Sequence, residues 1–218
     1  NKDLTKLIEY PEGRKGTKVI IPTSVKNVEE EALSEGSGIV CKKNSFIANY
    51  AKENEIIHII DDGGPKVYLS NNGEEIPRKS SSTDVEVKDI ESEVIESSLK
   101  YIWSTKTEIT KNEINKTLTN GAKLNAPSNV DGNYYLYVYA QDVYGYETIF
   151  KSNVFKLDNT APTATVKYST KNLTNQDVVV TITANEEIQE IDGWILSENK
   201  KILSKEYKEN KEESIITT

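Results

Sequence analysis

Alternation of apolar and polar residues dominates most of the chain. It is strongest around Tyr134, Leu136, Val138 and Ala140, which fall on one face of an extended segment while the tyrosines between them fall on the other. Runs of this kind, separated by turn-forming residues, predict six short β-strands at 66–70, 83–88, 98–104, 117–120, 133–140 and 148–156. Because no long helical period lies between the runs, we predict a mostly β fold, with an antiparallel sandwich over residues 63–158.

The strand pattern restarts beyond a turn-prone joint at 158–163. Pro162 fixes its own φ and pushes Ala161 toward an extended conformation. Beyond the joint, alternation predicts strands at 165–168, 178–184, 193–197 and 214–218. Residues 159–218 number about 60, whereas a full immunoglobulin-type sandwich needs about 100 residues. We therefore expect a second sandwich that is partial and truncated.

Residues 1–62 follow a different pattern. Short apolar runs recur there at intervals of about 12–20 residues, which is near the repeat lengths of solenoids. Between these runs, 24–33 and 45–54 carry apolar residues at helical spacing, and Ser45 is a suitable N-cap. The glycines and proline of 61–65 end this region. The pattern predicts a short α/β solenoid end ahead of the sandwiches.

Two segments of this first region carry a repeat-like motif. The first has the pattern Ile21-Pro22-x-Ser24-Val25-x-x-Val28-x-x-x-Ala32-Leu33, and the second is 44–54. The motif resembles the repeat of BspA-type leucine-rich repeat proteins, and 44–54 resembles the last repeat of such an array. The resemblance implies the C-terminal portion of a leucine-rich repeat solenoid. Such solenoids need about three or more repeats for stability, so we expect the array to begin upstream of this chain.

Several residues of the later regions match signatures of immunoglobulin-like cores. Tyr134 begins its strand and Leu136 follows two residues later, as in a tyrosine corner, and Trp103 suits the core tryptophan. Trp194 has the corresponding place in the last region. Together with the joint at 158–163, these residues resemble the tandem Ig-like modules of surface proteins from low-GC Gram-positive bacteria. The resemblance implies an extracellular or cell-wall-associated, adhesin-like protein in which Ig-like domains act as spacers.

Composition narrows the classes of partner. The 218-residue chain has a formal net charge of −8 at pH 7 and no long basic run, which argues against nucleic acid or an anionic membrane as a partner. Cys41 is the only cysteine, so an intramolecular disulfide framework is excluded. No apolar run approaches the roughly 20 residues of a membrane span, and no signal peptide opens the chain. Since the chain begins with Asn and lacks Met, we expect a fragment whose targeting and anchoring segments lie elsewhere.

A stripe of tyrosines is the first candidate binding site. Tyr135, Tyr137 and Tyr139 share one face of the expected strand, and aromatic rings there are suited to stacking on sugars or packing against a partner. The alternative is that a neighbouring strand around Ile102 covers the stripe through cross-strand pairs.

Acidic residues near the joint are the second candidate, as a calcium site. Asp142 ends the aromatic strand, Asp158 and Asn159 lie in the joint, and Glu186 and Glu187 follow a strand of the next region. Calcium takes six to eight oxygen ligands, often from converging loops. The alternative is that Asp158 and Asn159 only build an Asx-turn at the strand end. We expect no other cofactor.

Cys41 and His58 are the only Cys and His of the chain. A nucleophilic pair would need hydrogen-bond distance and a third, orienting group. In the repeat-like region Cys41 is expected to act as a small hydrophobe, and a zinc site lacks further Cys or His ligands. We therefore expect no catalytic residues and no enzyme activity.

These features predict a non-catalytic fragment of a bacterial cell-surface or secreted protein that acts in adhesion or binding. Its expected partner is a host or cell-surface protein or glycan. Recognition is expected on the concave face of the solenoid or on the tyrosine stripe. The alternative is an accessory region of a larger extracellular enzyme, which includes the case of a carbohydrate-binding module.

Overall fold

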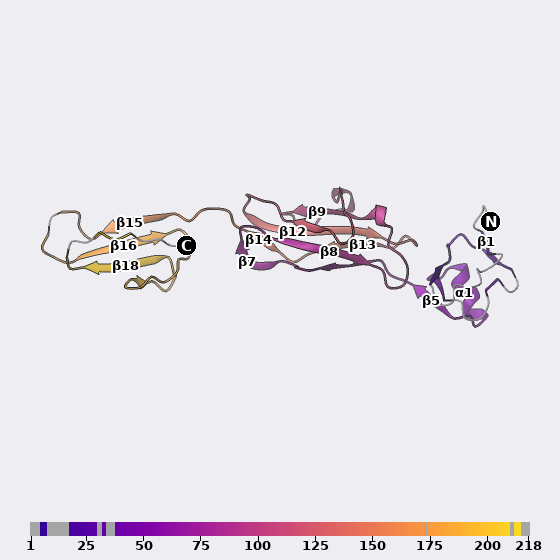
Figure 1. Cartoon of the computed structure of the whole chain (residues 1–218). Coiled ribbons are helices and arrows are strands. Elements are labelled where there is room, and N and C mark those ends of the chain that lie inside the picture. Colours follow the sequence, from indigo (N-terminus) through magenta and orange to yellow (C-terminus); the bar gives the residue numbers. More distant parts are fainter. Residues whose placement is uncertain are drawn as a thin grey trace. The chain divides into compact units, whose positions relative to one another are not determined.

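The computed structural model describes residues 5–7, 18–29, 32–33, 38–172, 174–209 and 212–214 (Figure 1). Strands hold 42% of the residues and helices 7%, which confirms the predicted mostly β class. The chain divides into two compact units, Asn1–Asn159 and Thr160–Thr218. Within the described ranges, no helix is both long and apolar enough to cross a membrane.

A small parallel sheet lies in the N-terminal part of the first unit. Its strands are β2 (Val19–Ile20), β4 (Ile39–Lys42) and β5 (His58–Asp61), in the order β2-β4-β5. Val19 pairs with Ile39, and Ile39 pairs with His58, so equivalent positions of the three strands are in register. Parallel neighbours of this kind require a crossover connection, and helix α1 (Phe46–Glu53) supplies it between β4 and β5.

Helix α1 forms where the sequence predicts it. The Ser45 side chain accepts a hydrogen bond from the backbone N–H of Ala48 at 3.2 Å, which is an N-cap of the expected kind. The helix and one face of the sheet enclose an apolar core made of Ile21, Val25, Ile39, Cys41, Ile47, Ala48 and Ala51.

The predicted helix over 24–33 is wrong. The segment contains strand β3 (Asn27–Val28), which pairs in parallel with β1 (Lys6–Leu7). Backbone N–H groups on either side of β3 donate to carbonyls of the β1 segment, so they are not available for helical bonds. Three of the apolar residues at helical spacing, Val25, Val28 and Leu33, still pack on the core. Residues 30 and 31 lie outside the described residues.

A β-sandwich makes up the rest of the first unit, as the alternation predicts (Figure 1). The smaller sheet contains β6 (Lys66–Leu69), β8 (Ser82–Lys88) and β11 (Lys123–Asn125). The larger sheet contains β7 (Glu74–Arg78), β9 (Lys100–Ser104), β10 (Lys116–Thr117), β12 (Gly132–Gln141), β13 (Glu147–Lys151) and β14 (Phe155–Leu157). Two 3-10 turns, η1 (Glu96–Ser98) and η2 (Lys111–Glu113), interrupt the connections.

The core of the sandwich lies between these two sheets. Residues from both contribute to it: Val85, Val87, Leu99, Leu118, Leu124, Leu136, Val138 and Ala140. Trp103 packs against this core, and its ring makes an edge contact with Phe155 at 4.8 Å between centroids. The prediction that Leu136, Val138 and Ala140 share one face of their strand is confirmed, and that face lies in the core.

The expected strand at 148–156 is two strands. β13 pairs with the second half of β12, and β14 pairs with the first half on the same side. Between them, the buried Ser152 donates its backbone N–H to the Leu136 carbonyl, and its hydroxyl accepts the Leu136 N–H at 2.8 Å. This exchange of bonds keeps the edge of β12 satisfied where the pairing passes from one strand to the next.

The second unit contains a four-stranded antiparallel sheet in the order β15-β16-β18-β17. Its strands are β15 (Ala164–Tyr168), β16 (Val178–Ala184), β17 (Ile195–Leu196) and β18 (Ile202–Tyr207). Trp194 is buried, and its ring makes an edge contact with Tyr207. The predicted strand at 214–218 lies, apart from Ser214, outside the described residues, and Ser214 is not in a strand.

Candidate functional site

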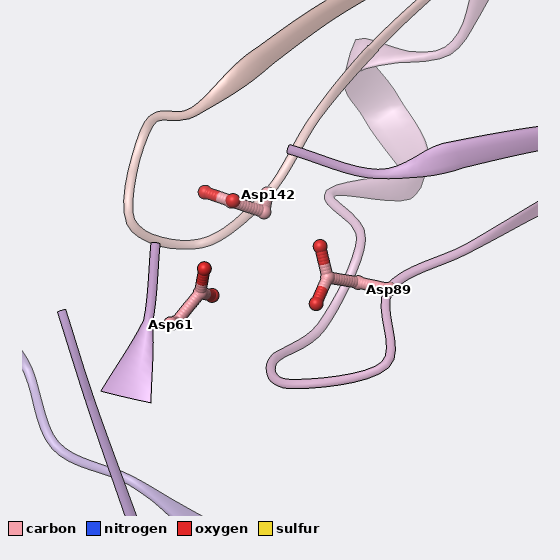
Figure 2. Close-up of side chains that lie close together, drawn as sticks. All are labelled: Asp61, Asp89 and Asp142. Atoms are coloured by element: carbon pink, nitrogen blue, oxygen red, sulfur yellow. The ribbon is translucent and has the colours of Figure 1, made fainter. Parts of the chain in front are cut away.

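Three aspartates from separate parts of the first unit come together (Figure 2). One carboxylate oxygen of each of Asp61, Asp89 and Asp142 lies within 4.8 Å of the other two. Asp61 is the last residue of β5, Asp89 directly follows β8, and Asp142 directly follows β12. The cluster therefore joins the parallel sheet to both sheets of the sandwich.

Local hydrogen bonds fix each of these carboxylates. Asp142 Oδ1 accepts the backbone N–H groups of Tyr144 at 2.8 Å and Tyr146 at 2.9 Å. The Gly145 N–H donates to the Asp142 carbonyl and closes a tight turn, in which Gly145 has φ +83°. A positive φ of this size favours glycine, so the sequence itself specifies the turn after β12.

The other two aspartates use their Oδ1 atoms in the same way. Asp89 Oδ1 accepts the N–H groups of Glu91 at 3.0 Å and Ser92 at 2.7 Å. Asp61 Oδ1 accepts the Gly63 N–H at 3.3 Å. Each carboxylate is therefore held by backbone donors that follow it in the chain, as in an Asx-turn.

The remaining carboxylate oxygens of Asp61 and Asp142 lack partners. Asp61 and Asp142 are fully buried, and the Oδ2 atom of each has no hydrogen-bond partner. Figure 2 shows the three side chains close together, each coming from a different part of the ribbon. Among the described residues, no Lys or Arg forms an ion pair with any of the three. An ionised carboxylate that is buried without a partner is costly, so this arrangement requires a compensating charge or a bound proton.

Burial and like charge outweigh the opposing hydrogen bonds in the electrostatics of Asp142. Burial raises the pKa of Asp142 above its ordinary value, the N–H groups of Tyr146 and Tyr144 oppose this rise, and the charges of Asp61 and Asp89 add to it. Two like unit charges 4.8 Å apart repel by about 3.5 kcal/mol at an effective dielectric constant of 20. A divalent cation would reverse the sign of this interaction.

The predicted calcium residues are divided between the two ends of the sandwich. Asp142 follows the last residue of β12, whereas Asp158 follows Leu157, which pairs with Gly132 at the first residue of β12. The ten residues of β12 span about 30 Å. The structure thus brings Asp142 together with other aspartates and not with Asp158 or Asn159.

The joint residues take part in local contacts instead. The Asp158 N–H donates to the Arg78 carbonyl, and the Asn159 side-chain amide donates to the Val130 carbonyl at 2.8 Å. Asn159 also donates its backbone N–H to Asp131 Oδ1. These bonds fasten the end of β14 to the sandwich. The predicted acidic residues of the second unit, Glu186 and Glu187, are exposed or half-buried.

The tyrosine stripe is covered by the loop residues 106–114, which we call the covering segment. Tyr137 is 3% exposed and Tyr139 is 5% exposed, and both pack with Ile114. Ile102 of β9 pairs with Tyr137 across the sheet and packs on the same cluster. Tyr135 is half-buried, with the Lys151 ammonium 4.3 Å from its ring centroid. The buried rings present no open face for a ligand.

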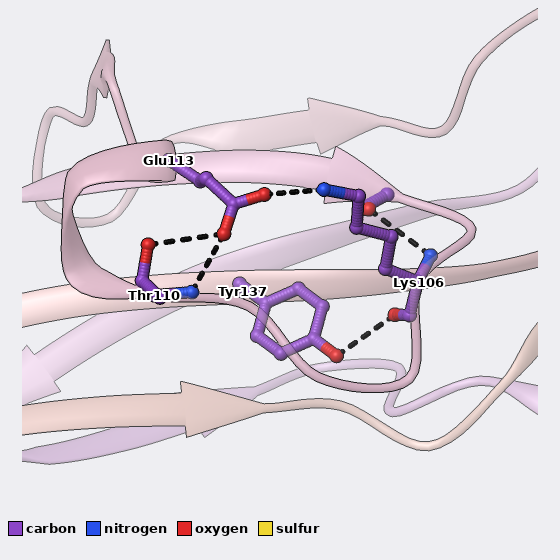
Figure 3. Close-up of polar contacts among 5 residues, drawn as sticks. Lys106, Thr110, Glu113 and Tyr137 are labelled. Atoms are coloured by element: carbon purple, nitrogen blue, oxygen red, sulfur yellow. Dashed lines mark hydrogen bonds and ion pairs between the residues drawn. The ribbon is translucent and has the colours of Figure 1, made fainter.

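Polar contacts hold that covering segment in place (Figure 3). The Tyr137 hydroxyl donates to the Lys106 carbonyl at 2.9 Å. Glu113 accepts hydrogen bonds from the N–H and hydroxyl of Thr110, and its other oxygen lies 2.6 Å from the Lys106 ammonium. These bonds lower the pKa of Glu113 to about 2, the Lys106 contact being the strongest cause.

Tyr144 joins the sandwich to the parallel sheet. Its side chain is buried, and its hydroxyl lies 2.5 Å from the Val40 carbonyl oxygen and 3.1 Å from that of Ile21. In return, the Lys42 ammonium donates to the Tyr144 carbonyl at 2.7 Å. Burial raises the pKa of the Tyr144 hydroxyl, which keeps it protonated as a donor.

Cys41 and His58 take separate structural places. The Cys41 side chain lies in the core of the parallel sheet, and burial raises the pKa of its thiol to about 11. His58 is half-buried, and its Nδ1 atom lies 2.7 Å from the Ile56 carbonyl oxygen. A thiol of such high pKa is a poor nucleophile at neutral pH.

Sequence reasoning missed Asp61 and Asp89 as partners of Asp142. A signal was present, because each of the three is an aspartate directly at the end of an apolar alternating run. Only the topology shows that these three strand ends meet.

Comparison of the chain with protein-family models, with curated proteins and with solved structures finds no match.

Proposed function

We propose that this chain is a non-catalytic part of a bacterial cell-surface or secreted protein and that it acts in adhesion or binding. Its N-terminal region is the last portion of a BspA-type leucine-rich repeat solenoid, and the two β units that follow are Ig-like spacers. The partner is a host or cell-surface protein or glycan.

The spacing of the parallel strands supports the solenoid. β2, β4 and β5 begin at Val19, Ile39 and His58, and these three residues are in register. Successive strands therefore recur after 20 and 19 residues, close to the repeat length of leucine-rich repeats, about 20–29 residues. Solenoids of this kind bind partners on extended surfaces built from successive repeats.

The placement of Tyr144 is the single observation that carries the proposal. A turn of the sandwich inserts the buried Tyr144 side chain against the parallel sheet, where its hydroxyl hydrogen-bonds to the carbonyl oxygens of Val40 and Ile21. A flexible linker would leave the two parts free to turn, whereas this contact fixes them. A fixed connection suits a spacer that presents a binding surface in one orientation.

The test is saturable binding of the labelled chain to cultured epithelial cells, measured by flow cytometry. We expect binding that is lost when the cells are treated with protease or with glycosidase, and the effective treatment identifies a protein or a glycan partner. The absence of saturable binding to cells, matrix proteins and a glycan array would refute the proposal.

Surface variants locate the interaction. Ile57 is 75% exposed beside β5, and Ile59 on β5 is 36% exposed. We expect Ile57→Lys with Ile59→Lys to reduce binding at least tenfold. The matched control is Ile195→Lys in the second unit, where the side chain is 73% exposed. Equal loss in both variants would place recognition outside the solenoid end.

A further inference from the structure

We propose that Asp61, Asp89 and Asp142 bind a calcium ion that ties the parallel sheet to the sandwich. This inference goes beyond the adhesive role and does not depend on it. The three residues end β5, β8 and β12, so one ion held among them would connect three strand ends.

The first support is the pair of unpartnered buried oxygens. Asp61 Oδ2 and Asp142 Oδ2 are fully buried atoms without a hydrogen-bond partner. Both belong to carboxylates that lie, with that of Asp89, in one cluster with an oxygen of each within 4.8 Å of the other two (Figure 2). Buried polar atoms are nearly always satisfied in native proteins, so two unpartnered oxygens within one carboxylate cluster indicate a ligand there.

The second support is the preorganisation of the carboxylates. The Oδ1 atom of each aspartate is held by backbone N–H groups, which leaves Oδ2 of Asp61 and Asp142 free to face the centre. Ligating carboxylates of metal sites are themselves hydrogen-bonded in this way, which fixes their orientation before the ion arrives.

The chemistry of the ligands selects calcium. The oxygens lie within 4.8 Å of one another, separations that ligands of one Ca²⁺ ion at bond lengths of 2.3–2.6 Å can have. Mg²⁺ demands shorter bonds of about 2.0–2.1 Å and near-ideal octahedral geometry. No His or Cys belongs to the cluster, so softer metals that prefer nitrogen or sulfur are disfavoured.

The decisive experiment compares the whole chain with its Asp142→Asn variant by scanning calorimetry, in CaCl₂ and in EDTA at pH 7. The asparagine keeps the Oδ1 acceptor for Tyr144 and Tyr146, removes the charge and replaces the unpartnered Oδ2 by an amide NH₂ group. In EDTA we expect the variant to melt at or above the wild-type temperature, because like-charge repulsion is relieved. In calcium the order should reverse: wild type gains about 5–10 °C at a hundredfold excess over Kd, and the variant gains less than 1 °C.

Matched controls separate this site from the general acidity of the chain. Asp62 is adjacent to Asp61 but is exposed and paired with Lys43, and Asp158 lies at the far end of the sandwich. Asp62→Asn and Asp158→Asn should keep the full calcium shift. A calcium shift that survives Asp142→Asn, or its absence in the wild type at millimolar CaCl₂, would overturn the proposal.

Terbium gives a readout that does not depend on stability. Tb³⁺ occupies calcium sites, and its luminescence is sensitised by nearby tyrosines such as Tyr144 and Tyr146, whose N–H groups bind Asp142. We expect sensitised emission that calcium displaces and that Asp89→Asn reduces at least tenfold. Equal emission from Asp89→Asn and Asp62→Asn would mean that Tb³⁺ binds elsewhere and would also overturn the proposal.

Discussion

Replacing Tyr144 by Phe should loosen the parallel sheet while leaving its packing intact. The substitution removes only the hydroxyl, which lies 2.5 Å from the Val40 oxygen and 3.1 Å from the Ile21 oxygen. Because Tyr144 is 6% exposed, water does not readily replace the lost donor. The Val40 oxygen keeps the hydrogen bond from the Ile21 N–H at 3.0 Å, whereas no other donor to the Ile21 oxygen is found among the described residues. Leaving that buried acceptor unsatisfied costs about 1–3 kcal/mol.

The chain carries its own probe for this change. Cys41 is the only cysteine, it neighbours Val40 in β4, and it is fully buried. A thiol reagent can reach it only when the parallel sheet opens. When reclosing is fast, the labelling rate equals the opening equilibrium multiplied by the rate of the exposed thiol. A cost of 1–3 kcal/mol therefore predicts labelling that is about 5- to 150-fold faster in Tyr144→Phe.

Tyr146→Phe is the matched control. It removes a hydroxyl two residues away, for which no hydrogen bond is found among the described residues, and its ring still faces the Lys42 ammonium at 4.6 Å. We expect its labelling rate to stay within twofold of wild type. If Tyr144→Phe also stays within twofold, the sandwich does not stabilise the parallel sheet through this hydroxyl, and the argument for a fixed connection fails.

Two further predictions concern the sandwich. The pKa of Glu113 is lowered to about 2 from 4.5 in the folded protein. As the pH falls, Glu113 is therefore protonated in the unfolded state before it is protonated in the folded state. The stabilisation by Glu113 is present above pH 4.5 and is lost as the pH falls toward 2. Urea midpoints of wild type and Glu113→Gln should therefore differ at pH 7 and converge near pH 2, and a constant difference would contradict this assignment. Gly73 has φ +80°, and a Cβ there would lie 2.2 Å from the Val154 oxygen, so Gly73→Ala should lose more than about 1 kcal/mol of stability in urea unfolding followed by fluorescence. Gly121 has a similar φ, and a Cβ there would have no atom within 4 Å. Equal losses of stability in Gly73→Ala and Gly121→Ala would therefore refute a contribution from the clash with Val154.

The local sequence pattern predicted an element correctly where no long-range contact opposed the local preference. β16 occupies the predicted residues 178–184 because an uninterrupted run of β-branched residues, Val178–Thr183, lies there. Helix α1 forms because Ser45 supplies a cap that no other local signal opposes. β7 (Glu74–Arg78) was not predicted, since its charged residues and Pro77 are atypical of a strand interior. It forms at the edge of its sheet, where proline is tolerated.

Pairing between distant segments decided the remaining elements. Spacing of Val25 and Val28 suits a helix, but pairing of β3 with β1 makes the segment extended while both residues still face the core. Alternation placed Tyr137 and Tyr139 on one face correctly. It contained no information about the segment around Ile114 that covers them, because that contact depends on a loop rather than on periodicity.

The turn after β12 links the candidate calcium site to the connection between the parallel sheet and the sandwich. Asp142 Oδ1 binds the N–H groups of Tyr144 and Tyr146, and the Tyr144 hydroxyl binds the parallel sheet. Any ligand that holds the Asp142 carboxylate in this orientation also holds the turn that positions Tyr144. Coupling between two sites is reciprocal. The contact of Tyr144 with the parallel sheet must therefore favour ion binding by the same free energy by which the bound ion favours that contact. One short turn thereby couples ion binding to the orientation in which the proposed binding surface is presented.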